Sequence, residues 1–302
     1  MSKIRTALNV ITSGKKIIRP LGDNGLLNWM PDEIYLKLLY KSETGLKLHL
    51  DEPQSFSEKL QWLKLHDRRQ EFVTLVDKYA VKDHVGKIIG KQYIIPTLGV
   101  WDNAEDIDFD RLPNQFVLKC NHDSGGIVIC KSKSELNEKA AVKKLTTHLK
   151  RNPYCFGREW PYKMVQRKII AEQFLEDETK DLTDYKFYCF NGVPTYCQVI
   201  KDRRTRESID FYDMDWKLQP FTGFHTPGKP FPHGTPTRKP ERLSEMIGIA
   251  EKLSIGVPFS RIDLYYVNNH VYFGEFTLFP KSGLGVFEPD EWNYILGKKL
   301  NL

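Results

Sequence analysis

Hydrophobic residues recur at helical spacing through the first part of the chain. The pattern predicts a helix within residues 31–50, which begins with acidic residues. A second helix is expected after Ser55 or Ser57, either of which can cap it, and a third over residues 72–90, where Gly90 ends the pattern. The first part of the chain is therefore predicted to be rich in helices.

Beyond residue 90 the pattern changes to short β-type runs. Strands are expected in "QFVLKC" and "GIVICKS", and the polar loop "NHDSGG" joins them as a hairpin. A helix over residues 134–151, starting at Ser134 or Glu135, is followed by the strand "RKIIAEQFLE" and by three strands within residues 184–216. A Pro- and Gly-rich loop, an amphipathic helix and a hairpin with a tight Asn-Asn turn complete the pattern, with a helix at the end. This order predicts an α+β fold with antiparallel sheets.

The stretch "FVLKCNHDSGG", residues 116–126, concentrates chemically active side chains. Cys120, His122 and Asp123 lie too close together for zinc-type spacing, and Ser124 lacks the GxSxG context of a nucleophile. The two glycines allow backbone N–H groups to approach an anion, and Lys119 adds a point charge. The stretch is therefore either a phosphate-binding loop or a glycine-rich hairpin with a surface lysine.

A second cluster lies in "RIDLYYVNNHVYFGEFTLFP". Arg261 and Asp263 are two apart on one predicted strand, as are Glu275 and Thr277 on the next, so each pair shares one face. If the pairs meet across the hairpin, two carboxylates suit Mg²⁺ and an arginine beside them suits a phosphoryl group. The alternative is a salt-bridge ladder on a solvated face.

Two weaker patterns are compatible with a nucleotide site. Glu172 ends an apolar strand that runs on as a linker, so the backbone of residues 173–175 could read an adenine edge. Lys78 and Lys82 are four apart on one predicted helical face, and either could reach phosphate. A solvated basic face is the alternative for the two lysines.

The composition and the net charge of the chain exclude few classes of protein. The formal net charge is +6, and the hydrophobic content of 40% is ordinary for a globular protein. Five cysteines without CxxC spacing, and no export signal, favour a cytoplasmic protein with reduced thiols. The N-terminal "MSKIRTALNVITSGKKIIR" is expected to be either a plain helix or tail, or a basic amphipathic helix at the inner face of the membrane.

Taken together, these pieces resemble the ATP-grasp superfamily. The resemblance rests on "DKYAVK" at 77–82, the lysine and glycine-rich loop at 119–126, the acid-led hinge at 172–175 and the "RID…EFT" hairpin. The phrases "FSEKLQWLKL", "DKYAVKD", "LKCNHDSGG" and "DYKFYCFNG" are similar to the TupA-like branch, which is associated with teichuronopeptide and capsular polysaccharide biosynthesis. The resemblance implies a helix-rich region 1–76, a small lid subdomain 77–171 and a larger subdomain 172–302.

The resemblance also implies roles for individual residues. The residues expected to bind ATP are Lys82, Lys119, His122, Ser124, Gly125, Gly126, Glu172, Gln173, Phe174 and Leu175. Those expected to bind one or two Mg²⁺ ions are Asp263, Glu275 and Thr277, the last at a position where many relatives carry Asn. Arg261 would stabilise the transferring phosphoryl group, and Asp184 and Lys186 would be a catalytic charged pair.

The implied activity is that of an ATP-dependent carboxylate–amine ligase. We expect an amino acid as the amine and an acidic sugar or polysaccharide as the carboxylate, with Arg203, Arg204 and Arg206 as candidates to hold the glycan. A glycosyltransferase is the alternative enzyme, and its only candidate diphosphate motif is Asp213-Met214-Asp215. A nucleic-acid-binding module is disfavoured, because the basic residues are dispersed and no motif is present.

Overall fold

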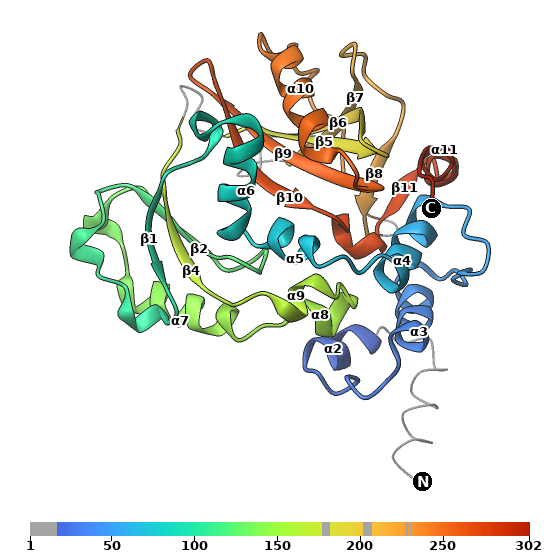
Figure 1. Ribbon diagram of the computed structural model, residues 1–302, viewed down its shortest axis with the longest axis horizontal. Helices are drawn as coiled ribbons and strands as arrows, with labels where there is room; N and C mark the ends of the chain where they lie inside the picture. The colour runs from blue at the N-terminus through green and yellow to red at the C-terminus, as the bar shows by residue number, and fades with distance from the viewer. Residues whose placement is uncertain (1–16, 177–181, 202–206, 227–228, 230) are drawn as a thin grey trace.

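Two antiparallel sheets form the framework of the molecule (Figure 1). The computed structural model describes residues 17–176, 182–201, 207–226, 229 and 231–302. The first sheet has the order β1-β4-β2-β3, built from β1 (Thr97–Trp101), β2 (Phe116–Cys120), β3 (Ile127–Cys130) and β4 (Ile169–Gln173). The second has the order β10-β9-β5-β6-β7, built from β5 (Asp184–Phe190), β6 (Val193–Lys201), β7 (Ser208–Asp213), β9 (Phe259–Val267) and β10 (His270–Thr277). A separate pair is formed by β8 (Thr222–His225) and β11 (Val286–Glu288).

Helices precede the sheets in the chain, as the hydrophobic pattern predicts. The early helices are α2 (Ile18–Asp23), α3 (Asp32–Thr44), α4 (Phe56–His66), α5 (Glu71–Val76) and α6 (Ala80–Ile89). Later helices are α7 (Glu138–Leu149), α8 (Pro153–Gly157), α9 (Pro161–Met164), α10 (Leu243–Ser254) and α11 (Glu291–Lys299). The described part of the chain also contains the short 3₁₀ helices η1 (Lys91–Tyr93), η2 (Ala104–Asp106), η3 (Phe109–Arg111), η4 (Lys133–Glu135) and η5 (Pro280–Gly283). The predicted α+β class with antiparallel sheets is confirmed.

Each sheet has its own hydrophobic core. In the first, Ala141 and Leu145 of α7 are buried against Phe116 and Leu118 of β2. In the second, Met246 and the other apolar residues of α10 belong to a larger core. Figure 1 shows α5 and α6 between the two sheets, and contacts join α5 to β10 and α6 to α10. The two short helices α5 and α6 therefore lie between the two sheets.

Local caps explain where several helices begin. Ser55 caps α4: its hydroxyl accepts from the Glu58 N–H, and the Glu58 carboxylate accepts from the Ser55 N–H at 3.0 Å. This reciprocal arrangement satisfies two N–H groups that the first turn would otherwise leave unpaired. Ser55 is thus the cap, and the alternative, Ser57, is not.

Three expected elements differ from the sequence pattern. The helix expected over residues 72–90 is broken, because the Asp77 carboxylate accepts from the N–H groups of Tyr79 and Ala80 and starts a second helix there. The helix expected from Ser134 or Glu135 begins after Asn137, whose side chain accepts from the Ala140 N–H. The long Pro- and Gly-rich loop contains β8, which forms because β11 pairs with it.

Three further expectations from the sequence stay predictions. The expected basic N-terminal helix and the arginines 203, 204 and 206 lie outside the described residues. The expected division after residues 76 and 171 stays a prediction, and β4 extends across the second of these positions. In the described part of the chain, every helix is too short or too polar to cross a bilayer.

Candidate active site

A buried carboxylate joins two lysines from different elements. Glu172 lies on β4, is 4% exposed, and faces Lys119 of β2 and Lys82 of α6. One carboxylate oxygen lies 2.6 Å from the Lys82 Nζ, and the other contacts the Lys119 Nζ. Lys82 also donates to the Ile95 carbonyl at 2.8 Å and to the Thr97 hydroxyl at 2.9 Å. The three residues that the sequence assigns to ATP phosphates and adenosine are therefore brought together.

Charge and burial oppose each other in this group. Burial alone would raise the pKa of Glu172, but Lys119 and Lys82 outweigh it and hold the pKa below its ordinary value. Burial lowers the pKa of Lys82, and the nearby Glu172 counteracts only part of that effect. Two ammonium groups and one carboxylate leave a net positive charge, which suits an anion such as phosphate.

The β9–β10 hairpin brings together the second predicted cluster. Its turn is Asn268-Asn269, with φ values of 49° and 60°, and a register shift between Phe273 and Glu275 places Arg261 opposite Thr277 and Asp263 opposite Glu275. Asparagine tolerates this left-handed backbone better than other side chains do, which explains the tight turn. The expected meeting of the two pairs across the hairpin is confirmed.

Arg261 is the centre of this cluster. Its guanidinium donates to both oxygens of Asp263 at 2.7 Å, to Glu275 at 2.9 Å and to the Thr277 hydroxyl at 3.1 Å. Lys186 of β5 contacts the Asp263 carboxylate, and Asp184 lies 3.9 Å from the Lys186 Nζ. All six predicted residues of β9, β10 and β5 thus form one partly buried polar network in which cations and carboxylates alternate.

Burial and the neighbouring cations have opposite effects on two carboxylates of this network. Burial would raise the pKa of Glu275, but Lys78, Arg261 and Lys186 outweigh it and hold that pKa well below its ordinary range. Burial raises the pKa of Asp263, and Arg261 and Lys186 counteract only part of that effect. Burial would lower the pKa of Arg261, but the adjacent Asp263 outweighs it and holds that pKa above its ordinary value.

The donors of this network fit a magnesium ion. Asp263 and Glu275 present carboxylate oxygens from opposite strands, and the Thr277 hydroxyl lies 3.4 Å from a Glu275 oxygen. Mg²⁺ takes oxygen ligands and usually keeps waters and substrate phosphates among them. Within the described ranges, no group of three or more His, Cys, Asp or Glu side chains could hold a metal ion. The protein would therefore supply two carboxylates and one hydroxyl, and leave other positions to the substrate.

The loop between β2 and β3 is held by side chains that the sequence did not single out. Asn121 is fully buried, donates to Asp77 and to the Gln166 carbonyl, and accepts from the Lys168 N–H at 2.8 Å. Asp123 contacts His148 of α7 and accepts from the Ser124 N–H at 2.7 Å. Asn121 lies two residues after Lys119 in the motif, and its complete burial is visible only in the fold.

His122 and the loop glycines shape the loop through packing. His122 is 1% exposed, its ring nitrogen lies 3.0 Å from the Arg151 carbonyl, and burial lowers its pKa to about 4. A Cβ on Gly126 would lie 2.8 Å from the His148 Cβ and 2.9 Å from the Cys120 sulfur, and one on Gly125 would lie 2.7 Å from the His148 ring. Glycine is needed here for close approach, and Ser124 is the exposed side chain of the loop.

Lys78 is a functional candidate that the sequence pattern misplaced. It was expected to share a helical face with Lys82, but it precedes α6 and points elsewhere. Its Nζ donates to the Asp123 carbonyl at 3.1 Å and lies 3.6 Å from a Glu275 oxygen. Lys78 therefore links the glycine-rich loop to the hairpin cluster, while Lys82 forms an ion pair with Glu172.

Tyr265 lies beside the hairpin cluster, as the partner of Asp184 across β5 and β9. Burial raises its pKa well above the ordinary value, and the charges of Asp184, Glu275, Asp263 and Glu172 add to this effect.

The expected hinge, residues 172–175, overlaps the end of β4, which extends to Gln173. The Gln173 N–H donates to the Pro96 carbonyl at 3.0 Å, so this N–H is engaged in the first sheet. Phe174 is half-buried, and the Lys131 Nζ lies 5.6 Å from its ring centre. Leu175 is half-buried as well. The three residues lie beside Glu172, where the sequence placed an adenine-binding backbone.

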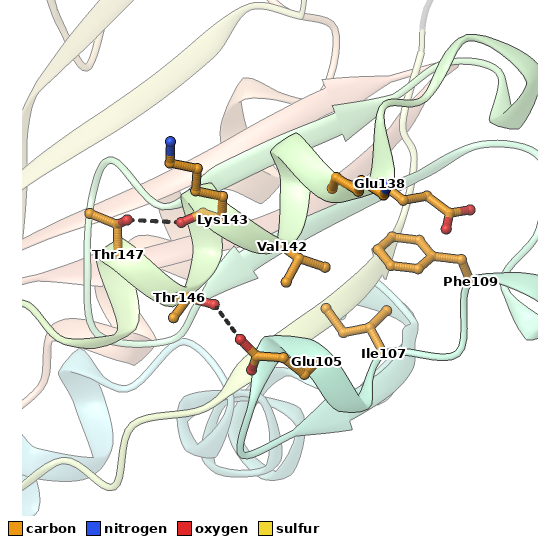
Figure 2. A pocket seen from close by; sticks show the side chains of 9 residues that line it. Glu105, Ile107, Phe109, Glu138, Val142, Lys143, Thr146 and Thr147 are labelled. Atoms are coloured by element: carbon orange, nitrogen blue, oxygen red, sulfur yellow. Dashed lines mark hydrogen bonds between the residues drawn. The ribbon is translucent and has the colours of Figure 1, made fainter.

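A surface cavity of about 630 Å³ lies apart from these clusters. Figure 2 shows it between α7 and the η2–η3 segment, with Ile107, Phe109 and Val142 as its apolar part. The Thr146 hydroxyl donates to Glu105 at 3.1 Å on its rim. None of the residues assigned above lines this cavity.

The candidate diphosphate motif of a glycosyltransferase is part of a turn. One Asp213 oxygen accepts from the N–H groups of Asp215 and Lys217 at 3.0 and 2.8 Å, and the other accepts from Gln219 at 3.2 Å. Asp215 is exposed and lies 3.7 Å from the Lys217 Nζ. These contacts explain both aspartates as turn-forming residues.

Comparison with known proteins gives the family. A sequence model described as TupA-like ATPgrasp matches residues 58–301, and no curated protein matches the chain. Similar solved structures include the D-alanine–D-alanine ligase from Bacillus anthracis complexed with ATP, at 15% identity and a TM-score of 0.38 over 68% of this chain. They also include the D-alanine–D-alanine ligase from Helicobacter pylori, at 13% identity and a TM-score of 0.43 over 82% of this chain.

Each match covers a smaller share of the similar protein than of this chain. The match spans 54% of the Bacillus anthracis chain and 70% of the Helicobacter pylori chain. The family match, in contrast, includes the Glu172 group, the glycine-rich loop and the whole hairpin cluster. With its ATP-grasp fold, this chain belongs to the TupA-like ATP-grasp family.

Proposed function

We propose that this protein is an ATP-dependent ligase that joins a carboxylate to an amine through an acyl-phosphate. The observation that carries the proposal is the pair of charge clusters on facing sheets. Lys82, Lys119 and Glu172 form a net positive group, and the hairpin cluster combines two Mg²⁺-type carboxylates with Arg261. ATP-grasp proteins bind ATP between such elements, and the family assignment places this chain among them.

The roles of the side chains follow from their positions. Lys82 and Lys119 would hold ATP phosphates, and the loop residues 122–126 would cover them. Glu172 and the backbone of residues 173–175 would hold adenosine. Mg²⁺, when bound by Asp263 and Glu275, would neutralise phosphate charge. Arg261, with Lys186 and Asp184 beside it, would stabilise charge on the transferring phosphoryl group.

The reaction needs little covalent chemistry from the protein. An oxygen of the substrate carboxylate attacks the γ-phosphorus, and the bond to the ADP oxygen breaks. The amine nitrogen then attacks the carbonyl carbon, phosphate leaves, and the nitrogen loses a proton to solvent. Positioning and charge neutralisation supply most of the rate, and a closed loop protects the acyl-phosphate from water.

For the substrates, we propose a hexuronic acid of a surface polysaccharide or its precursor, and an amino acid. The support is the TupA-like family, the formal charge of +6, and the net positive group around Glu172. A cytoplasmic location, with contact to the inner membrane through the basic N-terminal sequence, is part of the same proposal.

The test is a screen for ADP release with purified protein, ATP, Mg²⁺, a panel of uronates and a panel of amino acids. We expect ADP release only when a uronate and an amine are both present, and a product lighter by one water than the sum of the two. ADP release that needs neither, or consumption of a nucleotide sugar without ATP, would contradict the proposal. The second result would favour a glycosyltransferase.

A further inference from the structure

The segment that follows the metal-binding strand has an unusual backbone. Lys281, Ser282 and Gly283 of η5 have φ values of 50°, 56° and 63°. Left-handed backbone costs about 1–2 kcal/mol for each residue other than glycine, so two such residues in succession persist only where the surroundings fix them. The residues 281–283 are called the left-handed loop below.

Two side chains of α4 fix this loop. The Gln61 Nε2 donates to the carbonyls of Ser282 and Gly283, at 3.0 Å each. The Lys64 Nζ donates to the Ser282 carbonyl at 2.8 Å, to the Ser282 hydroxyl at 2.8 Å and to the Gln61 Oε1 at 3.0 Å. Lys64 thereby donates three hydrogen bonds, two to Ser282 of the loop and one to Gln61, the side chain that also holds the loop.

Lys64 is fully buried, which is costly for an ammonium group. The groups that face it are Gln61 on α4, Ser282 of the loop, the Phe279 ring at 5.7 Å, and the charge of Glu159 between α8 and α9. Burial lowers the pKa of Lys64 to about 8, and Glu159 counteracts part of that effect. Ser282 hydrogen-bonds to Glu159 as well, so its hydroxyl lies between the two charges.

The loop follows the end of the hairpin that lies away from the proposed adenosine site. The Asn268-Asn269 turn is at the other end, where the Asn268 Nδ2 donates to the Glu176 carbonyl at 3.4 Å, just beyond the expected hinge. The loop begins four residues beyond Thr277, and Figure 1 shows the chain after β10 turning toward α4. Burial raises the pKa of Tyr162, and the charges of Glu159 and Glu275 add to this effect.

We propose that Lys64 is a positioning residue, whose buried ammonium holds the left-handed loop in the conformation that receives the carboxylate or amine substrate. It acts through Ser282 and Gly283 and does not itself contact the substrates. The substrate part of this inference rests on the proposed ligase function, whereas the control of the loop does not. A lysine is used here because one ammonium can serve a carbonyl, a hydroxyl and an amide oxygen at once.

Hydrogen exchange of the loop amides tests the control of the loop without any enzyme assay. The Ser282 and Leu284 N–H groups donate within the loop, to Phe279 and Lys281, at 2.8 and 3.1 Å. In Lys64→Met we expect their exchange to be faster by about tenfold or more, because hydrogen bonds from a charged donor are lost. In the wild type, their protection should fall as the pH rises from 7 to 9.5, after correction for base catalysis, while α10 stays protected.

Lys59→Met is the matched control. Lys59 lies on the same helix and donates to the Leu300 carbonyl at 2.6 Å, away from the loop. Its removal should leave exchange of the loop unchanged. Unchanged exchange in folded Lys64→Met would overturn the proposal. So would wild-type protection that persists to pH 9.5, a result that needs no variant to fold.

The substrate part is tested by steady-state kinetics. In Lys64→Met we expect the KM of one of the two joined substrates to rise about tenfold, with the affinity for ATP unchanged, and the alkaline decline of activity to disappear. Equal losses for ATP and for both other substrates would indicate a merely structural role and overturn this part. Wild-type protein without ligase activity would contradict the proposed function, and the exchange experiment would still decide the role of Lys64 in the loop.

Discussion

Glu172 binds Lys82 with one carboxylate oxygen and Lys119 with the other, and so ties α6 to the first sheet. The two ammonium groups would repel each other without it. Phosphates of a bound nucleotide would meet lysines that are already held together, which reduces the entropy lost on binding. Glu172 therefore has a stabilising role in addition to the adenosine contact expected from the sequence.

Replacing Glu172 by Gln should lower the free energy of unfolding by about 3 kcal/mol, because two largely buried ammonium groups lose their carboxylate. Urea denaturation at pH 7 measures this. Since the folded pKa of Glu172 lies below its ordinary value of 4.5, its contribution is present above that pH and is lost as the pH falls further. Glu71→Gln, which changes a surface carboxylate near Arg69, should have little effect. Equal stabilities of both variants would contradict the assigned role.

Lys82→Met should weaken ATP binding about tenfold or more, because a charge-assisted contact to phosphate is lost. Calorimetric titration with ATP and Mg²⁺ measures this. Lys87 lies on the same helix and pairs with the exposed Asp83, so Lys87→Met should bind ATP as the wild type does. If the two variants bind equally well, Lys82 does not contact the nucleotide.

How far the sequence predicts the site depends on how far apart in the chain the interacting residues lie. Which residues meet across the hairpin also depends on the register shift between Phe273 and Glu275, but the shared face of each pair was predictable from the two-residue alternation of strands. The bridge between Lys82 and Lys119 was not, because it depends on how α6 packs against the first sheet. The break at Asp77 has the same origin: the capping carboxylate also accepts from Asn121, which is distant in the chain.

The same distinction explains one residue that the sequence misplaced, Lys78, and one that it did not single out, Lys64. Helical periodicity put Lys78 and Lys82 on one face, but Lys78 lies before α6 and reaches Glu275. Lys64 was one of many polar positions in an amphipathic helix, and only the packing of η5 against α4 buries it. Local patterns predict which residues share an element, and tertiary contacts decide what those residues touch.

The buried imidazole of His122 predicts a loss of stability in acid. Its pKa is about 4 in the folded protein, because of burial, against 6.5 when unperturbed. Between pH 4 and pH 6.5 the His122 imidazole is protonated in the unfolded chain and neutral in the folded protein. The free energy of unfolding should therefore fall by about 3 kcal/mol as the pH drops from 6.5 to 4. In His122→Gln this part of the pH dependence should disappear in urea denaturation series. His84→Gln, which changes an exposed residue of α6, should retain it, and an unchanged slope in both variants would refute the assignment.

Gly126→Ala should destabilise the protein by about 1–3 kcal/mol, because the added methyl group would overlap His148 and Cys120. It should also weaken ATP binding, since the loop would shift. Gly248 of α10 is the matched control: a Cβ there meets open space, and Gly248→Ala should stabilise by about 0.5–1 kcal/mol. Thermal unfolding and ATP titration measure both effects. Normal ATP binding by a destabilised Gly126→Ala would show that this loop does not cover the phosphates.

Asp263→Asn separates the ligase from the glycosyltransferase. The variant keeps the shape of a side chain that is 2% exposed, but removes the charge that faces Arg261 and Lys186. It should reduce Mg²⁺-dependent ADP release by about 100-fold or more, the effect typical of losing one group that stabilises transition-state charge. Asp215→Asn changes an exposed residue of the Asp213–Asp215 turn and should leave ADP release unchanged. The reverse result, with activity dependent on Asp215 and not on Asp263, would contradict a metal site in the hairpin and would favour one in the Asp213–Asp215 turn. A charged group stabilises only the phosphates that it faces, so the variant that loses activity identifies the site.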